Sequence, residues 1–397
     1  MKVFALFMHN CVYGKSIGGI ERRFIEVTKH LKGIEKIYAL EYHPSLSKEI
    51  PSGYIGLPVL HFKAQTVTGE LKILIRLSLI SILSCRKFGC DVVYSPRQDN
   101  PEAFVPAFFT SLFLRKPLAI VFHSLPPDGY GVKTPLQKLM RFRLANHEGI
   151  RKATIKTVID LVRRLAYSRA EICFAVSETT QRHLCQFFTP RRVIVSGNGV
   201  GDEWFEISPV PKNFDVAYLG RIHPRKRLEL LIQAWKEVLR KQPRSKLLLI
   251  GGGDSEHVKH YQMMIAELGL QDSVTMTGFL DDASIRRHLS SARIFAFPSS
   301  REGFGLAIAE AMACGLPCLL SDIPPLREAF SGAAVFVSGS DPSLWANALS
   351  DIIADKDKQA ILSNLSRSVA NSYRWKDVAN REGDAMMRLG SKVDARS

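Results

Sequence analysis

The stretch that decides the fold reads PSSREGFGLAIAEAMACG and runs from Pro298 to Gly315. It follows the apolar run Ile294–Phe297, which is typical of a buried parallel strand. A glycine-containing loop comes next, and the small apolar residues after it favour a helix. Because ligands of parallel sheets bind at the carboxyl ends of the strands, we expect a ligand site here.

Two glutamates, Glu302 and Glu310, stand in this stretch with seven residues between them. A buried carboxylate is unfavourable unless it is hydrogen-bonded, so we interpret both as ligand groups. Glu302 would accept hydrogen bonds from sugar hydroxyls, and Glu310 would accept a pair from a ribose diol. The N–H groups at the helix start would face an anion. The alternative is a surface loop glutamate and a helix glutamate that is capped within the protein.

A basic turn from Gly220 to Arg227 follows the apolar run 214–219, the expected first strand of the second half. Arg221 can bind phosphate as a planar fork and Lys226 as a point charge, so together they suit a diphosphate. The alternative is a solvated basic turn ahead of a helix.

In the first half, Gly18 and Gly19 precede a predicted helix over residues 20–31, and His123 follows the predicted strand 118–122. Two glycines let a phosphate or sugar approach the backbone closely. His123 at a strand end can donate to a sugar hydroxyl, although a lone histidine there is more often structural. The chain holds neither the G-x-G-x-x-G dinucleotide fingerprint nor a P-loop.

Strand and helix patterns alternate along the 397 residues, which predicts an α/β fold in two domains with parallel sheets. Turn-rich residues 199–213 interrupt the alternation and are the predicted linker. We expect an N-terminal Rossmann-like domain over 1–198, a C-terminal Rossmann-like domain over 214–374 and a final helix over 375–397. Residues 134–169 are predicted to be helical, with a break near Gly149.

The composition is that of a globular protein, with 46% hydrophobic residues, 23% charged residues and a net charge of +16. This excess of positive charge favours polyanions: nucleic acid, anionic lipid or phosphorylated substrates. Residues 133–169 hold ten Lys and Arg among apolar residues, which suits an anionic membrane surface. An ordinary basic surface helix is the alternative. Because aromatic residues are not interleaved in this basic stretch, we expect no nucleic acid partner.

The seven cysteines form no C-x-x-C pair, so we expect reduced thiols and no metal site. The apolar segment 71–85 is broken by Lys72 and Arg76 and is too short to span a bilayer. We therefore expect a cytoplasmic protein, with any membrane contact peripheral and on the inner face.

The run EGFGLAIAEAMACG (302–315) resembles the signature of retaining GT-B glycosyltransferases of the group 1, or family 4, type. The resemblance extends through the second half in the G-R-x4-K run 220–226, the glycines at 251–252 and residues 277–280. In the first half it is looser, through residues 18–21, 122–124 and 196–200. Ala307 and Arg227 depart from the family pattern, in which proline and glycine are usual at these positions.

The resemblance implies two Rossmann-like domains with parallel sheets that face each other across a cleft, the last helix crossing back to the N-terminal domain. It implies transfer of a hexose from a UDP- or GDP-sugar to a glycan or lipid-linked acceptor. The anomeric configuration would be retained, and no metal or other cofactor would be needed. The N-terminal domain would bind the acceptor, and the C-terminal domain would bind the nucleotide sugar.

The resemblance also implies roles for single residues. Arg221 and Lys226 would hold the donor diphosphate, and Glu310 would bind the ribose. Glu302 and His123 would act at the transferred sugar as the catalytic residues. The remaining substrate contacts would come from Gly18, Gly19, Gly303, Phe304, Gly305 and Leu306.

Three other functions stay open at this point. One is a nucleotide-sugar 2-epimerase on the same fold, and another is a basic nucleic-acid-binding protein. The third is an inactive transferase fold that serves as a scaffold at a membrane.

Overall fold

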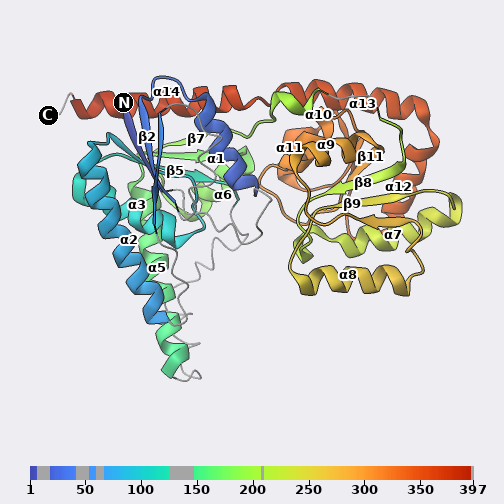
Figure 1. Cartoon of the computed structure of the whole chain (residues 1–397), viewed down its shortest axis with the longest axis horizontal. Helices are drawn as coiled ribbons and strands as arrows, with labels where there is room; N and C mark the ends of the chain where they lie inside the picture. Colours follow the sequence, from blue (N-terminus) through green and yellow to red (C-terminus); the bar gives the residue numbers. More distant parts are fainter. Residues whose placement is uncertain (7–17, 42–52, 60–66, 125–146, 207–209, 395–397) are drawn as a thin grey trace. The chain divides into compact units, whose positions relative to one another are not determined.

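The computed structural model of the chain describes residues 1–6, 18–41, 53–59, 67–124, 147–206 and 210–394 (Figure 1). The described residues form two compact units. Unit 1 contains the chain up to Gly197 together with the segment from Lys376 onward, and unit 2 contains Asn198–Trp375. Each unit has its own parallel sheet with helices packed on it, as predicted.

The sheet of unit 1 has seven strands in the order β3-β2-β1-β4-β5-β6-β7, and all pairs are parallel. The strands are β1 Lys2–Leu6, β2 Lys36–Glu41, β3 Tyr54–Pro58, β4 Val92–Ser95, β5 Leu118–Phe122, β6 Ile172–Ala175 and β7 Val193–Val195. Every residue of β5 is buried. A strand reads as an unbroken apolar run when helices cover both faces of the sheet, which is why β5 could be recognised from sequence.

Helices pack on both faces of this sheet (Figure 1). The helices of unit 1 are α1 Gly19–His30, α2 Val67–Phe88, α3 Pro101–Leu114, α5 His147–Arg169, α6 Glu178–Phe187 and α14 Trp375–Asp394. Leu77 of α2, Phe104 of α3 and Tyr167 of α5 lie in one hydrophobic core with Phe122. Phe24 of α1 and Met386 of α14 lie in the other core.

The sheet of unit 2 has six parallel strands in the order β10-β9-β8-β11-β12-β13. They are β8 Phe214–Leu219, β9 Leu247–Ile250, β10 Val274–Met276, β11 Ala292–Phe297, β12 Cys318–Ser321 and β13 Ala334–Val337. The helices are α7 Leu228–Lys241, α8 Ser255–Glu267, α9 Asp282–Ser290, α10 Leu306–Ala313, α11 Pro324–Phe330, α12 Pro342–Ala354 and α13 Lys356–Asn371, with short 3₁₀ turns at Asp202–Trp204 and Pro224–Lys226. Trp235 of α7 and Trp345 of α12 are fully buried.

Two elements differ from those expected from sequence, and one prediction stays open. Helix α5 starts at His147, two residues before Gly149, and runs through this glycine. Because residues 134–146 lie outside the described residues, the break near Gly149 stays a prediction. Strand β3 and helix α11 were not expected. Parts of three predicted segments lie outside the described residues: 7–8 of the predicted first strand 2–8, 134–146 of the predicted helical region and 207–209 of the predicted linker.

Strand order fixes where a ligand can bind in each unit. In unit 1 the order reverses between β1 and β4, and in unit 2 it reverses between β8 and β11. The loops that follow the two strands at such a reversal run in opposite directions. A crevice therefore forms between these loops at the carboxyl ends of the strands. Residues 298–315 directly follow β11, so they lie at the reversal point of unit 2.

Candidate functional site

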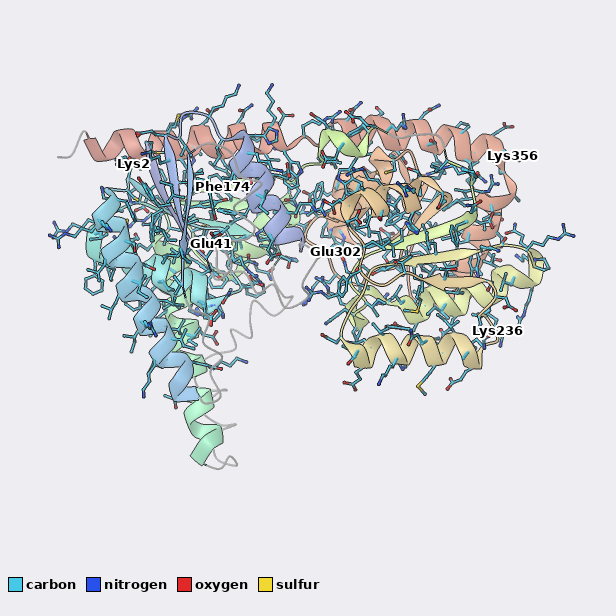
Figure 2. All side chains as sticks on the ribbon, in the orientation of Figure 1. Lys2, Glu41, Phe174, Lys236, Glu302 and Lys356 are labelled. Carbon is cyan, nitrogen blue, oxygen red and sulfur yellow. The ribbon has the colours of Figure 1, made fainter. Side chains whose placement is uncertain are left out.

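A buried ion pair joins the two loops at the reversal point of unit 2. Lys226, in the loop after β8, places its Nζ 2.6 Å from Oε1 of Glu302, in the loop after β11. The side chains expose only 11% and 10% of their surface. Figure 2 labels Glu302 in unit 2. Two residues that the sequence assigned to one site are therefore in direct contact.

The Glu302 carboxylate is held ionised by its neighbours. Ser299 Oγ donates a second hydrogen bond to Oε1 at 2.6 Å. Burial would raise the pKa of Glu302, but the charges of Lys226 and Arg225 and the two hydrogen bonds outweigh it and lower the pKa. The nearby carboxylate adds to burial in raising the pKa of the Tyr218 phenol well above its ordinary value. Glu302 is thus a negative group that can accept hydrogen bonds at neutral pH.

Lys226 is a poorly hydrated cation at the same edge of the sheet. Burial lowers its pKa, although the Glu302 carboxylate acts in the opposite direction. Its Nζ also lies 4.6 Å from the centroid of the Phe297 ring, within cation–π distance. An ammonium group that is already stripped of water binds an incoming phosphate with a smaller desolvation penalty.

Three strand-end loops meet closely beside this pair. Ile222 donates its backbone N–H to the carbonyl of Gly252 at 2.8 Å, and Gly251 donates to the carbonyl of Gly278 at 3.2 Å. Gly251 has a φ of 126°, and a Cβ there would collide with the carbonyl oxygen of Gly220. Glycine is therefore required where the loops after β8 and β9 touch. Arg221 projects an exposed side chain from the first of these loops.

Helix α10 begins directly after the predicted glycine loop. Gly305 is its N-cap residue with a φ of 103° and, as a glycine, supplies no side-chain cap for the first turn. The N–H groups of this turn can therefore serve an anionic ligand. Phe304 packs its ring against Phe330 and Tyr373, so only its backbone faces the loop. Glu310 lies one turn into α10 and exposes 7% of its surface.

A second ion pair joins the loops at the reversal point of unit 1. Arg97, two residues after β4, places its Nη1 3.1 Å from Oε1 of Glu21 in the first turn of α1. Gly18 is the N-cap residue of α1, and a Cβ there would collide with the Glu21 carboxylate. Glycine thus makes room for this carboxylate beside Gly18, while Gly19 opens the helix and is exposed.

His123 lies at the same edge of unit 1, directly after β5. Its Nε2 is 2.8 Å from the carbonyl oxygen of Pro96, and its backbone N–H donates to Gln98 Oε1 at 3.2 Å. Burial and the positive charge of Arg23 lower its pKa to about 3. The imidazole is neutral at physiological pH. Because a carbonyl can only accept, Nε2 carries the proton and Nδ1 is left as an acceptor.

Sequence reasoning missed the residues that organise this edge of unit 1. Arg97, Gln98 and Asp99 form a polar run directly after buried strand β4, a signal that could have been used. It also missed Arg23, whose Nη2 donates to Glu382 Oε1 and to Ser196 Oγ, all within the buried core. Glu382 belongs to α14, and no local pattern in the sequence links it to Arg23.

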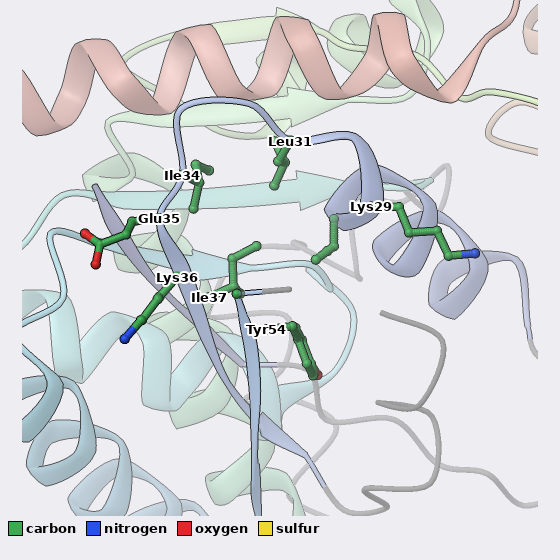
Figure 3. Close-up of a pocket in the computed structure, with 9 residues that line it drawn as sticks. Lys29, Leu31, Ile34, Glu35, Lys36, Ile37 and Tyr54 are labelled. Carbon is green, nitrogen blue, oxygen red and sulfur yellow. The ribbon is translucent and has the colours of Figure 1, made fainter. Parts of the chain in front are cut away.

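A separate pocket of about 230 Å³ lies in unit 1 (Figure 3). It is lined by the end of α1, the start of β2 and the start of β3, including Lys29, Lys36 and Tyr54. Parallel strands begin there, whereas ligand sites of such sheets lie where the strands end. This pocket therefore lies at the opposite end of the strands from the expected ligand site.

The family model for "Glycosyl transferases group 1" matches residues 201–369. D-inositol 3-phosphate glycosyltransferase of Kineococcus radiotolerans is 27% identical over 236 residues, which are 52% of this chain and 54% of the relative. The enzyme of the same name from Gordonia bronchialis is 31% identical over 187 residues, covering 45% of this chain and 40% of the relative. The chain thus spans about half the length of the curated relatives it matches.

Solved structures resemble the chain over nearly its full length. Anabaena HepE in complex with UDP-glucose has a TM-score of 0.75 at 20% identity and covers 98% of this chain and 100% of its own. WaaG, a glycosyltransferase involved in lipopolysaccharide biosynthesis, has a TM-score of 0.69 at 12% identity, with coverages of 97% and 99%. The chain therefore has the fold of the GT-B glycosyltransferases, and its residues 201–369 match the group 1 glycosyltransferase family.

Proposed function

We propose that the protein is a retaining glycosyltransferase that moves a hexose from a nucleotide diphosphate sugar to a lipid-linked or polysaccharide acceptor. The observation that carries the proposal is the Lys226–Glu302 pair at the reversal point of unit 2. It joins a buried cation that can bind phosphate to a buried carboxylate that can bind hydroxyls. The helix start that follows has glycine, which has no capping side chain, as its N-cap residue. This unit contains the segment that matches the group 1 family.

The donor would be held by groups of matching chemistry. Arg221 and Lys226 would bind the diphosphate, aided by the N–H groups from Gly303 to Leu306. Glu302 would accept hydrogen bonds from the transferred sugar, and Glu310 would accept them from the ribose. Lys226 and Glu302 would then exchange their mutual contact for contacts with the donor.

The transfer breaks the bond between the anomeric carbon and the diphosphate oxygen and forms one to an acceptor hydroxyl oxygen. The proton of that hydroxyl leaves with the departing diphosphate. Negative charge grows on the leaving diphosphate, and Arg221 and Lys226 stabilise it there. Retention by front-face attack without an enzyme nucleophile, and without a metal ion, is part of the proposal. Transfer that persists in EDTA and a product with the donor's anomeric configuration are the expected results.

In unit 1, we assign His123 to sugar recognition as a neutral group. Its Nδ1 would accept a hydrogen bond from a hydroxyl, because Nε2–H is engaged by Pro96. This differs from the expectation that the side chain donates. Gly18 and Gly19 would let substrate approach the start of α1. Unit 1 would bind the acceptor, and the final helix would support this unit.

The proposed acceptor places the enzyme at the cytosolic face of a membrane. No described helix is long and apolar enough to cross a membrane. Part of the basic region 133–169 lies outside the described residues, and the rest belongs to α5. The matched relatives favour a transferase over a 2-epimerase or a nucleic-acid-binding protein.

A thermal-shift screen against UDP-, GDP- and ADP-sugars tests the proposal. Binding at a hundred times the dissociation constant stabilises the folded state by about 2.7 kcal/mol, which is easily detected. We expect a UDP- or GDP-sugar to raise the melting temperature, and the Lys226→Ala variant to lose the response. A protein that responds to none of these donors would contradict the proposal.

A further inference from the structure

Helix α2 presents an apolar stripe to solvent. Leu71, Ile75, Leu79 and Leu83 expose 40%, 53%, 58% and 67% of their surface. They recur every fourth residue and therefore share one side of the helix. Singly exposed apolar side chains are ordinary, but a stripe of them along one helix marks an interaction surface.

Positive charges lie within the same exposed side of α2. Lys72, Arg76, Arg86 and Lys87 are exposed and alternate with the four apolar residues around the helix. At about 100° per residue, all eight side chains fall within an arc of roughly 160°. Among the side chains of α2 that the structure describes, Glu70 is the one exposed acid, and it lies outside this arc.

The neighbouring helix α5 also presents exposed apolar side chains. Val158, Leu161 and Leu165 expose 48%, 55% and 50% of their surface and share one side of the helix. Arg164, which neighbours Leu161 around the helix, is exposed as well, whereas Asp160 is buried against Arg163 at 2.5 Å. Helices α2 and α5 contact each other and run alongside in Figure 1.

Both helices extend beyond the sheet on the side where its strands end. With 22 and 23 residues, α2 and α5 are about 33 and 35 Å long, whereas the strands span at most about 20 Å. Short connections join Phe88 to β4 and Arg169 to β6, so the excess length lies at the helix starts. That is the edge of the sheet that carries His123.

We propose that the α2–α5 face binds the surface of an anionic lipid bilayer. The face consists of Leu71, Lys72, Ile75, Arg76, Leu79, Leu83, Arg86 and Lys87 of α2 with Val158, Leu161, Arg164 and Leu165 of α5. Its apolar side chains enter the boundary between headgroups and acyl chains, and its cations contact anionic headgroups. A second copy of the chain is a less suitable partner for this face, because a symmetric contact would bring the cations of one copy close to the same cations of the other. This inference deepens the proposed function, since it assigns a surface to the membrane contact.

Vesicle flotation of the full chain tests the proposal. Vesicles of phosphatidylcholine with phosphatidylglycerol should carry the protein upward, and pure phosphatidylcholine should carry far less. The Ile75→Gln/Leu79→Gln variant should bind the anionic vesicles at least about tenfold more weakly. Its matched control is Ile361→Gln/Leu365→Gln on α13, a pair with the same spacing and exposures of 61% and 40%, which should bind like the wild type.

Charge reversal tests the electrostatic part. The Lys72→Glu/Lys87→Glu variant should lose binding by about tenfold or more, and raised salt should weaken the wild type. The control is Lys236→Glu/Lys356→Glu on unit 2, two exposed lysines labelled in Figure 2. Wild-type binding in both α2 variants, or equal loss in the controls, would overturn the proposal. So would a wild type that ignores vesicles and forms a dimer that Ile75→Gln/Leu79→Gln dissociates.

The outcome can be separated from that of the proposed reaction. Donor binding by thermal shift needs no vesicles, so the α2 variants should keep the wild-type response to the donor. If the α2 variants lose vesicle binding but still bind the donor, the α2–α5 face is needed for membrane contact and not for the donor site. Normal vesicle binding without any donor response would leave this face supported and contradict the glycosyltransferase proposal.

Discussion

Lys226 Nζ lies 2.6 Å from Glu302 Oε1, and both side chains are almost fully buried. The two residues stand on loops that follow neighbouring strands β8 and β11, where the strand order of unit 2 reverses. The pair supplies the phosphate-binding cation and the hydroxyl-binding carboxylate of the proposed donor site. It also ties the two loops together before any donor arrives.

Removing one partner should destabilise unit 2. In Lys226→Met, Glu302 stays buried without its cation, and breaking a buried pair in this way typically costs about 3–5 kcal/mol. The double variant Lys226→Met/Glu302→Gln should recover part of the loss, because no uncompensated charge remains. Urea unfolding of the wild type, both single variants and the double variant measures the coupling. Additive losses would contradict a direct pair.

The neutral state of His123 predicts a pH dependence. Its pKa is about 3 in the folded chain and about 6.5 in the unfolded chain, so between these values only the unfolded chain binds the proton. The contribution of His123 to the free energy of unfolding is therefore fully present above pH 6.5. It is lost as the pH falls toward 3, by at most about 1.4 kcal/mol per pH unit.

Comparison with His123→Gln isolates this contribution. The free energy of unfolding of the wild type should fall relative to that of the variant between pH 7.5 and pH 5. A difference that stays constant over this range, or grows in favour of the wild type, would show that His123 is not held neutral.

The link between Arg23 and Glu382 should anchor the final helix to unit 1. Tyr94 donates to Glu382 Oε2 at 3.0 Å, so the carboxylate is bonded on both oxygens inside the core. Glu382→Leu leaves the Arg23 guanidinium buried without its counter-charge and should lower stability by about 3–5 kcal/mol. Asp377→Asn, an exposed position on the same helix, is the control and should change stability by less than about 0.5 kcal/mol.

Replacement of Arg227 by glycine should stabilise the folded protein. Arg227 has a φ of 52° and a ψ of 45°, the left-handed conformation that costs a non-glycine residue about 1–2 kcal/mol. Arg227 stands where glycine is usual in the family that the sequence resembles, and the left-handed backbone explains why glycine suits this position. We expect Arg227→Gly to raise the melting temperature by a few degrees. A clear fall in melting temperature would show that the Arg227 side chain stabilises the loop.

Much of the fold was predictable because its strands are buried on both sides. The runs at β5 and β8 were predicted with the bounds that the structure shows. Strand β3 was missed because Gly56 and Pro58 are unfavourable in central strands, yet β3 is an edge strand, where both are tolerated. Helix α11 was not predicted either, although Pro324 opens it and proline suits a first helical position.

The candidate site was only partly predictable. Lys226 and Glu302 were each recognised by type and by position after a strand, but 75 residues separate them in the sequence (227 to 301). Their contact depends on β8 pairing with β11, which the local pattern does not reveal. The same holds for Arg23 and Glu382, which meet only because α14 packs on the sheet of unit 1.

The most direct test of the account is acceptor-dependent transfer from the donor that thermal shift identifies. Release of nucleoside diphosphate and the labelled glycan product are measured for the wild type, Lys226→Ala and Glu310→Ala, with folding checked by circular dichroism. The account predicts transfer by the wild type and a loss of at least about a hundredfold in each variant, since both remove a donor contact. Full activity in either folded variant would contradict it.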